Sequence, residues 1–496
     1  MFESAELGHT IDDETYKREV EKLRAELLEA QSNLMEDRSF PVIVLVNGVD
    51  GGGKGTTVNL LNEWLDTRQV QNRAFGEETD DERLRPAMWR FWQALPPKGK
   101  IGVLFGNWYA DPIAAGTRKE LSTARLGIEL DRIRSFETML TDDGAVLVKL
   151  WFHLSKKAQR KRLTELENDK LQSWRVTPED WKHFARYDRA RKVSEHVLRE
   201  TSTGTAPWIV IDGSDPHYRA LSAGRALLAA LRAQLANKAA KEPKKKDAAS
   251  LVPLLQTVDS SGILTSLKFE ERLSKEKYSD KVVNAQSKLG QLTRSRKMQK
   301  RSVVAVFEGM DAAGKGGAIR RVAQALDVRQ ISVIPIAAPT DEERAQPYQW
   351  RFWRKLPRLG HMTIFDRSWY GRVLVERIEG FATEAAWSRA YHEINELEEQ
   401  LADGGVVVLK FWLAITKDEQ ARRFKERQDT KYKQWKITEE DWRNRKRWDD
   451  YIVAASDMID RTSTPYAPWT VIEANDKHLA RVRILETFAD RLGEAL

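Results

Sequence analysis

The sequence contains the same domain-sized pattern twice, and this duplication constrains the fold more than any other feature. The stretch NGVDGGGKGTT begins at Asn47, and EGMDAAGKGGA begins at Glu308. The lysines of these stretches are 261 residues apart, and the same offset relates four tryptophan pairs: Trp108 and Trp369, Trp151 and Trp412, Trp174 and Trp435, and Trp208 and Trp469. The register holds without a gap from about Val42 to Trp208. It therefore indicates duplication followed by divergence.

The repeat predicts two domains, residues 1–236 and residues 259–496, joined by a linker over residues 237–258. The stretch NKAAKEPKKKDAAS, Asn237 to Ser250, is rich in Lys and Ala and has no clean apolar stripe, as expected of an exposed tether. The length of 496 residues suits two large domains or about three average ones. Apolar residues make up 41%, which is enough for substantial cores and excludes wholesale disorder.

Each copy starts with a charged amphipathic helix, near residues 14–36 and 269–292, and then alternates short apolar runs with longer helical ones. In the second copy the expected strands are Val303–Phe307, Ile331–Ile336, Met362–Phe365, Val406–Leu413 and Trp469–Ile472. In the first copy they are Val42–Val46, Ile101–Leu104, Ala145–Phe152 and Trp208–Ile211. This alternation predicts an α/β fold with a parallel sheet covered on both faces. Ligands of such sheets bind beyond the carboxyl ends of the strands.

Composition narrows the chemistry. The absence of cysteine excludes disulfides, thiolate metal sites and cysteine nucleophiles. A net charge of +8 favours acidic partners such as nucleotides, polyphosphates, nucleic acid or anionic membrane, although a well-solvated surface would have the same composition. The acidic start has no apolar segment typical of a secretory signal, and no apolar run is long enough to span a bilayer. We therefore expect a cytoplasmic protein that does not associate with membranes.

The stretch from Gly309 to Lys315 fits the phosphate-loop pattern G-x-x-x-x-G-K, with a strand before it and an expected helix, Ala318–Leu326, after it. Small residues let backbone N–H groups surround phosphate oxygens, the helix N-terminus adds positive charge, and Lys315 supplies a mobile cation. The usual Ser or Thr that binds Mg²⁺ is Gly316 here, while the loop carries Asp311. A carboxylate beside phosphate is unfavourable without a cation between them, so Asp311 is expected to help hold Mg²⁺.

Two charged residues end the strand Met362–Phe365. Asp366 is placed to be a second Mg²⁺ anchor, although it could also cap a helix. Arg367 follows it and can reach phosphate oxygens with its planar guanidinium group.

The first copy keeps the loop, with Asp50 and Lys54, but not these two residues. Phe105 and Gly106 stand at the positions of Asp366 and Arg367, and Asp111 stands at the position of Arg372. We therefore expect the first domain to be inactive or impaired in catalysis and to survive as a structural or binding partner.

The region Lys417 to Arg447 holds twelve Lys or Arg residues and seven Asp or Glu residues. Arg423 and Arg427 share one helical face, which suits a lid over phosphates, although a solvated helix is the alternative. The first copy has Arg162 in place of Arg423, but Leu166 and Gln172 in place of Arg427 and Lys433.

The aromatic stretch from Pro339 to Pro357 could border a nucleotide base. A core position for Trp350, Phe352 and Trp353 is favoured, because similar aromatic residues recur in the weaker copy.

Several stretches together resemble the polyphosphate kinase 2 family: GMDAAGKGG, WRFWRKLP, FDRSWYGRVLVERIEGF, RRFKERQDTKYKQWKIT and TPYAPWTVI. The resemblance covers both halves, as in the tandem subgroup. It implies two P-loop kinase domains of the thymidylate-kinase type, three-layered α/β/α, each with a helical lid. It also implies Mg²⁺-dependent phosphoryl transfer, and the tandem subgroup is associated with making ADP from AMP and inorganic polyphosphate.

The candidate site residues follow from these motifs and from the resemblance. The catalytic candidates are Asp311, Lys315, Asp366, Arg367, Arg423 and Arg427, and Asp311 and Asp366 are also the metal candidates. The other phosphate-binding candidates are Gly309, Gly314, Gly316, Arg372, Lys431 and Lys433. An ATP-dependent nucleoside monophosphate kinase and a non-catalytic nucleic-acid-binding protein remain alternatives, the second disfavoured by the two carboxylates. The sequence leaves a homo-oligomer open.

Overall fold

The computed structural model describes residues 1–240, 262–431, 437 and 439–496. The chain divides into two compact units, Met1–Glu78 with Arg90–Lys246 and Thr340–Trp350, and Thr79–Trp89 with Asp247–Pro339 and Arg351–Leu496. Residues 79–89 and 340–350 are equivalent in the repeat, and each is grouped with the unit formed by the other copy. The predicted domain ends stay predictions, because residue 236 lies within a helix and residue 259 lies outside the described residues.

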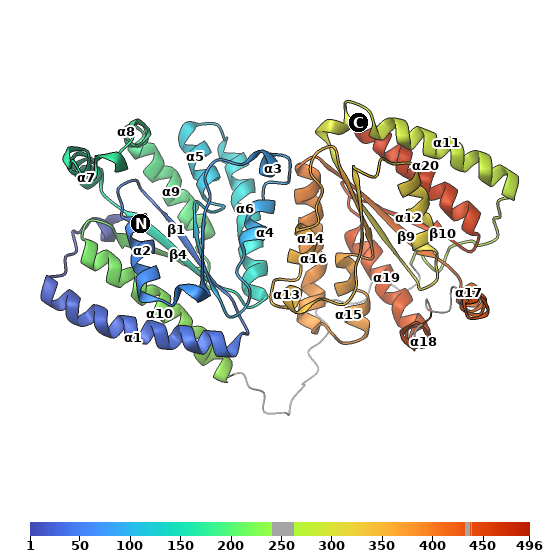
Figure 1. Ribbon diagram of the computed structural model, residues 1–496, viewed down its shortest axis with the longest axis horizontal. Helices are drawn as coiled ribbons and strands as arrows, with labels where there is room; N and C mark the ends of the chain where they lie inside the picture. The colour runs from blue at the N-terminus through green and yellow to red at the C-terminus, as the bar shows by residue number, and fades with distance from the viewer. Residues whose placement is uncertain (241–261, 432–436, 438) are drawn as a thin grey trace. The chain divides into compact units, whose positions relative to one another are not determined.

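Both units are built around a five-stranded parallel sheet, as the sequence predicted (Figure 1). The first sheet has the order β2-β3-β1-β4-β5, with the strands β1 Val42–Gly48, β2 Val70–Ala74, β3 Ile101–Phe105, β4 Val146–His153 and β5 Trp208–Asp212. The second has the order β10-β9-β6-β8-β7, with β6 Ser302–Gly309, β7 Ile331–Pro335, β8 Met362–Asp366, β9 Val406–Ala414 and β10 Trp469–Glu473. Allowing for the repeat, the two orders are the same.

Helices cover both faces of each sheet. The first unit contains α1 Asp13–Asp37, α2 Lys54–Trp64, α4 Trp89–Ala94, α5 Ala110–Arg118, α6 Thr123–Asp142, α7 Lys156–Asn168, α8 Pro178–Ala185, α9 Tyr187–Thr201 and α10 Pro216–Ala240. Its 3-10 turns are η1 Glu3–Glu6, η2 Thr67–Gln69 and η3 Ser173–Arg175, and the first copy also forms α3 Asp80–Arg83, within the residues grouped with the second unit.

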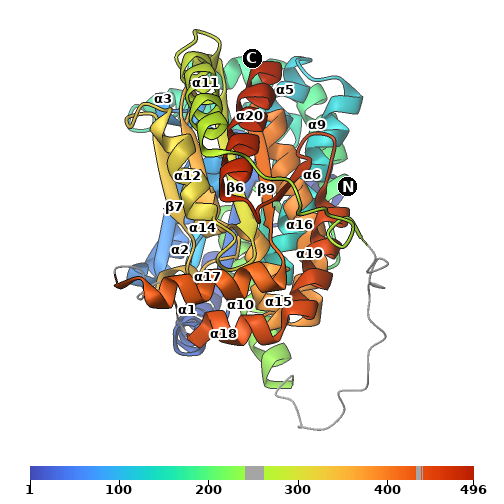
Figure 2. The ribbon, with the colours of Figure 1, turned by 90° about the vertical axis from the view of Figure 1, so that its right-hand side faces the viewer.

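In the second copy the helices are α11 Lys275–Thr293, α12 Lys315–Gln324, α13 Asp341–Arg344, α14 Trp350–Trp353, α15 Val375–Ile378, α16 Glu384–Asp403, α17 Lys417–Asp429, α18 Glu439–Lys446, α19 Trp448–Thr462 and α20 Lys477–Ala495. The 3-10 turns are η4 Met298–Lys300 and η5 Trp369–Arg372. Helices α11, α12 and α20 pack together on one face of the sheet and α15, α16 and α19 on the other, while α17 and α18 lie across one end of it (Figure 2).

Most predicted elements are confirmed within a few residues. One strand was missed: β2 has the sequence VQNRA, and only Val70 in it is buried, so it lacks an apolar pattern. One helix was predicted too long, since α11 begins at Lys275 rather than near residue 269. The predicted core positions of Trp350, Phe352 and Trp353 are confirmed, because all three side chains are buried.

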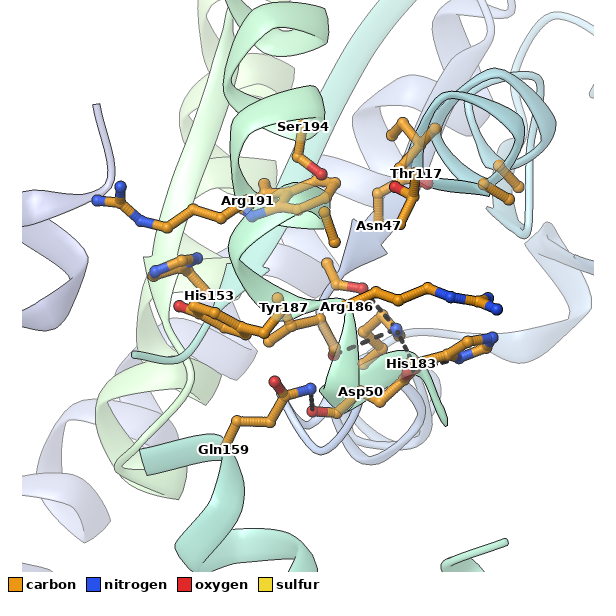
Figure 3. A pocket seen from close by; sticks show the side chains of 18 of the residues that line it. Asn47, Asp50, Thr117, His153, Gln159, His183, Arg186, Tyr187, Arg191 and Ser194 are labelled. Atoms are coloured by element: carbon orange, nitrogen blue, oxygen red, sulfur yellow. Dashed lines mark hydrogen bonds and ion pairs between the residues drawn. The ribbon is translucent and has the colours of Figure 1, made fainter. Parts of the chain in front are cut away.

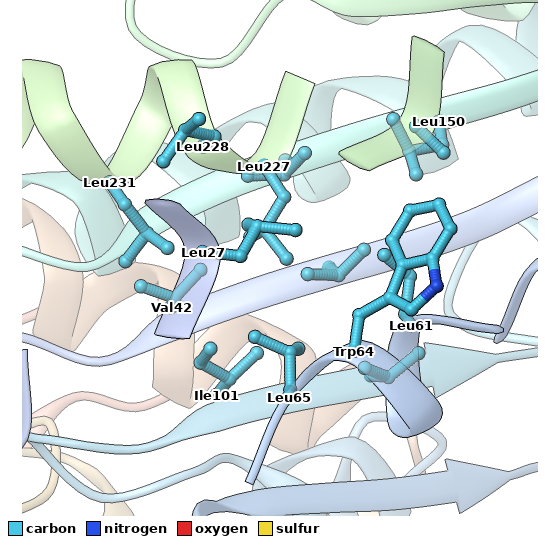
Figure 4. Close-up of a cluster of buried hydrophobic side chains, with 14 of the residues drawn as sticks. Leu27, Val42, Leu61, Trp64, Leu65, Ile101, Leu150, Leu227, Leu228 and Leu231 are labelled. Carbon is cyan, nitrogen blue, oxygen red and sulfur yellow. The ribbon is translucent and has the colours of Figure 1, made fainter. Parts of the chain in front are cut away.

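Each sheet carries an apolar core. In the first unit, leucines of α1 and α10 and Trp64 of α2 pack over β1, β3 and β4 (Figure 4). Residues of β1 from Val42 to Val46 are all buried, as expected of a central parallel strand that is covered on both faces.

A charged cluster is buried inside each unit at the same place. In the second, the Lys410 ammonium donates to Glu398 at 2.7 Å, to the Tyr370 hydroxyl at 2.9 Å and to the Thr462 carbonyl at 2.6 Å. The other Glu398 oxygen accepts from the Trp369 indole at 3.1 Å and from Tyr370 at 2.7 Å. The first unit repeats the whole cluster with Lys149, Glu137, Tyr109, Trp108 and Thr201. A buried ion pair of this kind is tolerated only because its hydrogen-bonding groups are satisfied.

Replacing Lys410 with Met should lower the free energy of unfolding by about 3–5 kcal/mol, because the change leaves a buried carboxylate without its cation. Lys149→Met should cost the first unit a similar amount. Urea unfolding followed by tryptophan fluorescence measures both effects. The control is Lys288→Met, which removes a surface pair with Asp490 and should cost no more than about 1 kcal/mol. Equal losses in Lys410→Met and Lys288→Met would contradict the assignment.

Candidate active site

The glycine-rich loop of the second unit joins β6 to α12, as the motif requires. Gly309 has a φ of 141°, and a side chain there would overlap the Leu413 carbonyl oxygen of β9, so only glycine fits this close approach. Lys315 begins α12 and folds back over the loop, where its ammonium donates to the Gly309 carbonyl at 2.6 Å. The loop therefore presents the N-terminus of a helix and a lysine on the same side, which suits an anion.

Asp366 ends β8, and the parallel register places it beside Phe307 of β6, just before the loop. A β-carbon built on Gly316 would lie 3.9 Å from the Asp366 Oδ2 atom, so this carboxylate faces the start of α12. Arg367 has a φ of 65°, a strained left-handed conformation for a residue with a side chain. Its Nη2 donates to the Asp311 Oδ1 atom at 3.0 Å, and Asn444 Nδ2 donates to the other Asp311 oxygen at 2.9 Å.

The structure thus brings Asp311, Lys315, Asp366 and Arg367 to one end of the sheet, and their charges affect one another. Burial lowers the pKa of Lys315, and the Arg367 charge adds to this effect, while the Asp311 and Asp366 charges oppose it. Burial acts to lower the pKa of Arg367 as well, but the Asp311 and Glu308 carboxylates outweigh it and the pKa is raised. A compact group of opposite charges of this kind is typical of a functional site.

Sequence reasoning missed Glu308, which precedes the loop. It is buried, accepts from the Ser368 hydroxyl at 2.9 Å, and has a pKa raised by its burial. A signal was available in the repeat, because the pair changes together: Asn47 and Asn107 replace Glu308 and Ser368 and bond to each other at 3.1 Å. The pair links the loop strand β6 to the segment after β8.

Two further residues were missed because they come from the distant helices α18 and α19. Asn444 holds Asp311, and Tyr451 lines the same small cavity, which has a volume of about 60 Å³. The Tyr451 hydroxyl is buried and has no hydrogen-bond partner among the described residues.

In the structure Arg423 contacts backbone carbonyls beside the loop. Its side chain is only 2% exposed, and its guanidinium donates to the Ala312 and Ala313 carbonyls at 2.9 Å and to the Ala474 carbonyl at 2.5 Å. Arg423 therefore ties α17 to the loop and to the end of β10. It positions the loop, and a direct role in catalysis stays a prediction.

The remaining candidates are dispersed around this centre. Arg427 is half-buried on α17, Lys431 is exposed just after that helix, and Arg372 pairs with Glu376 at 3.2 Å. Gly314 caps α12 with a φ of 110°. Lys433 lies outside the described residues, so its role as a phosphate ligand stays a prediction.

The candidate metal ligands of the second unit are the carboxylates of Asp311 and Asp366. The part of the chain that the structure describes contains no group of three or more His, Cys, Asp or Glu residues that could hold a metal by itself. Mg²⁺, however, is usually held by one or two carboxylates together with phosphate oxygens and water. Asp311 and Asp366 beside a phosphate loop fit that pattern, with substrate phosphate completing the shell.

The first unit has a different arrangement at the equivalent place. Phe105 and Gly106 leave no strand-end carboxylate, and Asp50 is bonded to His183 at 3.0 Å and lies 3.6 Å from Lys54 (Figure 3). A cavity of about 330 Å³ opens there.

Comparison with known proteins gives consistent matches. The family model described as polyphosphate kinase 2 matches residues 10–239 and 272–495. A polyphosphate:AMP phosphotransferase of Pseudomonas aeruginosa is 54% identical, with 100% of this chain and 99% of that protein covered, and one of Acinetobacter johnsonii is 40% identical, with 95% and 96% covered. A crystal structure of a polyphosphate kinase 2 from Pseudomonas aeruginosa superposes with a TM-score of 0.90 at 52% identity, covering 100% of this chain and 99% of that one.

Arg423→Ala should lower the free energy of unfolding by roughly 2–4 kcal/mol, because buried carbonyl oxygens lose a charged donor. Arg423→Lys should recover little of this, since one ammonium cannot span carbonyls on both the loop and β10. Chemical denaturation measures the change. The neighbouring Arg422→Ala is the matched control: it removes an exposed arginine and should cost no more than about 1 kcal/mol. A stability of Arg423→Ala equal to that of Arg422→Ala would contradict the positioning role.

Proposed function

The chain belongs to the polyphosphate kinase 2 family, and we propose that its second unit transfers the terminal phosphoryl group of inorganic polyphosphate to AMP, giving ADP. Relatives matched over nearly their whole length carry the name polyphosphate:AMP phosphotransferase. The observation that supports the assignment to the second unit is the convergence of Asp311, Lys315, Asp366 and Arg367 on one loop. The first unit lacks two of these four residues.

In the proposed reaction the polyphosphate chain lies along the basic face of α17, with its terminal phosphoryl group at the loop. The bond between that phosphorus and the rest of the chain breaks, and a new bond forms to a phosphate oxygen of AMP. Polyphosphate leaves one unit shorter. Because the attacking oxygen is already ionised, no strong general base is required, and positioning with charge stabilisation supplies most of the catalysis.

The residues of the chain divide this work. Backbone N–H groups of the loop and Lys315 hold the phosphoryl group, and Arg367, which rests on Asp311 at the mouth of the site, can swing onto its oxygens. Asp311 and Asp366 would hold Mg²⁺, which when bound neutralises charge on the phosphate oxygens. Glu308 holds the loop in place through its bond to Ser368, and Arg423 does so through its bonds to the loop carbonyls.

Two alternative functions also need an anion site. An ATP-dependent nucleoside monophosphate kinase would use the same loop and lid, but the names of the full-length relatives favour polyphosphate as donor. A nucleic-acid-binding protein would gain nothing from two carboxylates at its anion site, because they repel a phosphate backbone. ADP formation from AMP with polyphosphate and without ATP separates the polyphosphate-dependent enzyme from the ATP-dependent kinase. Salt-sensitive RNA binding without turnover would support the nucleic-acid-binding protein.

In the described residues no helix is both long and apolar enough to cross a bilayer.

Lys315→Ala should reduce turnover with polyphosphate and AMP by a factor on the order of 10² to 10³ or more, because the charge that develops on the phosphoryl group loses its cation. Lys54→Ala, the equivalent change in the first unit, should retain at least roughly a tenth of the wild-type rate. ADP release in a coupled assay measures both. Comparable losses in the two variants would show that the units share catalysis.

Asp366→Asn should lower turnover and raise the Mg²⁺ concentration for half-maximal rate by about tenfold or more, because a neutral amide is a weaker ligand for Mg²⁺. Initial rates over a Mg²⁺ titration give both values. Asp327→Asn changes a surface aspartate paired with Arg329 and should leave the Mg²⁺ curve unchanged. An unaltered curve in Asp366→Asn would remove this residue from the metal site.

A further inference from the structure

The first unit retains an open cavity where the second unit has its compact site. The cavity beside the loop of the first unit has a volume of about 330 Å³, and the cavity at the equivalent place in the second unit has a volume of about 60 Å³. Figure 3 shows its wall, formed by the ends of β1 and β4, by α8 and by α9. Ligand pockets typically enclose roughly 300–1,000 Å³, so the cavity is large enough for a small organic molecule.

The cavity exists because two large side chains of the second unit are replaced by small residues in the first unit. At the offset of 261 residues, Ala190 stands for Tyr451 and Gly106 for Arg367. A unit kept only as scaffold would be expected to fill such a space, since interiors are close-packed and voids cost stability. An open cavity at the old phosphate loop therefore points to an occupant.

Where the cavity meets the glycine-rich loop, positively charged side chains surround Asp50, which is the one carboxylate in the loop. Asp50 bonds to His183 at 3.0 Å and lies 3.6 Å from Lys54. Burial acts to raise the pKa of Asp50, but these two partners outweigh it and the pKa is lowered; the bond to Asp50 in turn raises the pKa of His183. Arg186 also lines the cavity, and its charge helps to lower the pKa of Glu179 there. Glu179 also lines the cavity, 3.8 Å from His183, but the cationic side chains of the lining outnumber the two carboxylates. This excess of positive charge suits a phosphate group, and no carboxylate ends β3 to help hold a metal.

Beside the loop, two buried polar groups in the wall lack partners among the described residues. They are the indole N–H of Trp151, whose side chain is 4% exposed, and the Nδ1 atom of His153, at 1% exposure. Phe2 stacks on the His153 ring at 4.3 Å, and His153 Nε2 bonds to Glu6 at 2.8 Å. Burial lowers the pKa of His153, so the ring is neutral and, with Nε2–H donating to Glu6, its Nδ1 accepts. The aromatic rings of this wall suit the flat face of a nucleobase, and the two buried atoms offer it one donor and one acceptor after a small side-chain movement.

We propose that this cavity binds a nucleoside monophosphate without a metal ion, the phosphate at Lys54, His183 and Arg186 and the base against Trp151 and His153. A single phosphate matches the few cations at the loop end, and the aromatic wall excludes a bare inorganic chain as the preferred ligand. The site is distinct from the transfer site of the second unit and does not depend on the reaction proposed there.

Calorimetric titration of the full chain with AMP in the presence of EDTA tests the proposal. Lys315→Ala serves as the background, because it weakens any binding at the loop of the second unit. We expect this variant to bind one AMP per chain. Adding Ala190→Tyr, which restores the tyrosine of the second unit and fills the cavity, should weaken AMP binding at least tenfold. Adding Trp151→Phe, which removes one donor, should weaken it about fivefold.

A further variant and further ligands complete the test. Adding Lys54→Ala to the background removes charge without filling the cavity and should also weaken binding at least tenfold, while unfolding temperatures within a few degrees of the parent show that the variants fold. Inorganic phosphate and short-chain polyphosphate should bind more weakly than AMP. The proposal fails if the background variant binds no AMP at millimolar concentration, if Ala190→Tyr and Lys54→Ala leave the affinity unchanged, or if phosphate or polyphosphate binds as tightly as AMP. All readouts are of binding, so failure here leaves the turnover assays of the second unit untouched.

Discussion

The buried lysine–carboxylate–tyrosine cluster is the interaction on which the arrangement of both units depends. In the second unit Lys410 and Glu398 hold Trp369 and Tyr370, the two residues that follow the strand-end motif of β8. By fixing this segment against β9 and α16, the cluster fixes where Asp366 and Arg367 emerge. The same contacts recur around Lys149 and Glu137 in the first unit, although Phe105 and Gly106 stand there in place of Asp366 and Arg367. The Trp-Tyr pair therefore belongs to the fold of both units, and the units differ in the two residues before it.

Backbone conformation separates the two units in the same way. Arg367 adopts a left-handed conformation that costs a residue with a side chain about 1–2 kcal/mol, and Gly106 adopts nearly the same φ, 71°, almost without strain. Strain is thus present where a guanidinium group is needed beside Asp311 and absent where it is not. This pattern is expected when backbone strain is maintained by a functional site.

The sequence predicted the parallel sheets, the loop and the strand-end pair, because each rests on local pattern together with the exact repeat. It failed where a role depends on three-dimensional register. In the sequence Glu308 is an ordinary acid before a loop, and only the structure shows its bond to Ser368. Asn444 and Tyr451 reach the site from helices that lie far along the chain. Arg423 reads as part of an exposed lid, yet α17 packs so closely on the loop that this arginine is buried. Charge and spacing predict the helix face on which a residue lies, but only the packing of the helices determines what that face contacts.

The divergence of the first unit extends beyond the loss of two residues. A β-carbon built on Gly106 would overlap the carbonyl oxygen of Phe75, so an arginine cannot return there without moving the chain that follows β2. His183 occupies the place of Asn444, and its bond to Asp50, which raises the pKa of His183, brings a cation where the second unit has a neutral amide. Restoring Asp and Arg at positions 105 and 106 would therefore not by itself rebuild the arrangement of the second unit. The backbone and the charges of the first unit have settled around a different state, in which protein cations balance the loop carboxylate and the space next to it stays open.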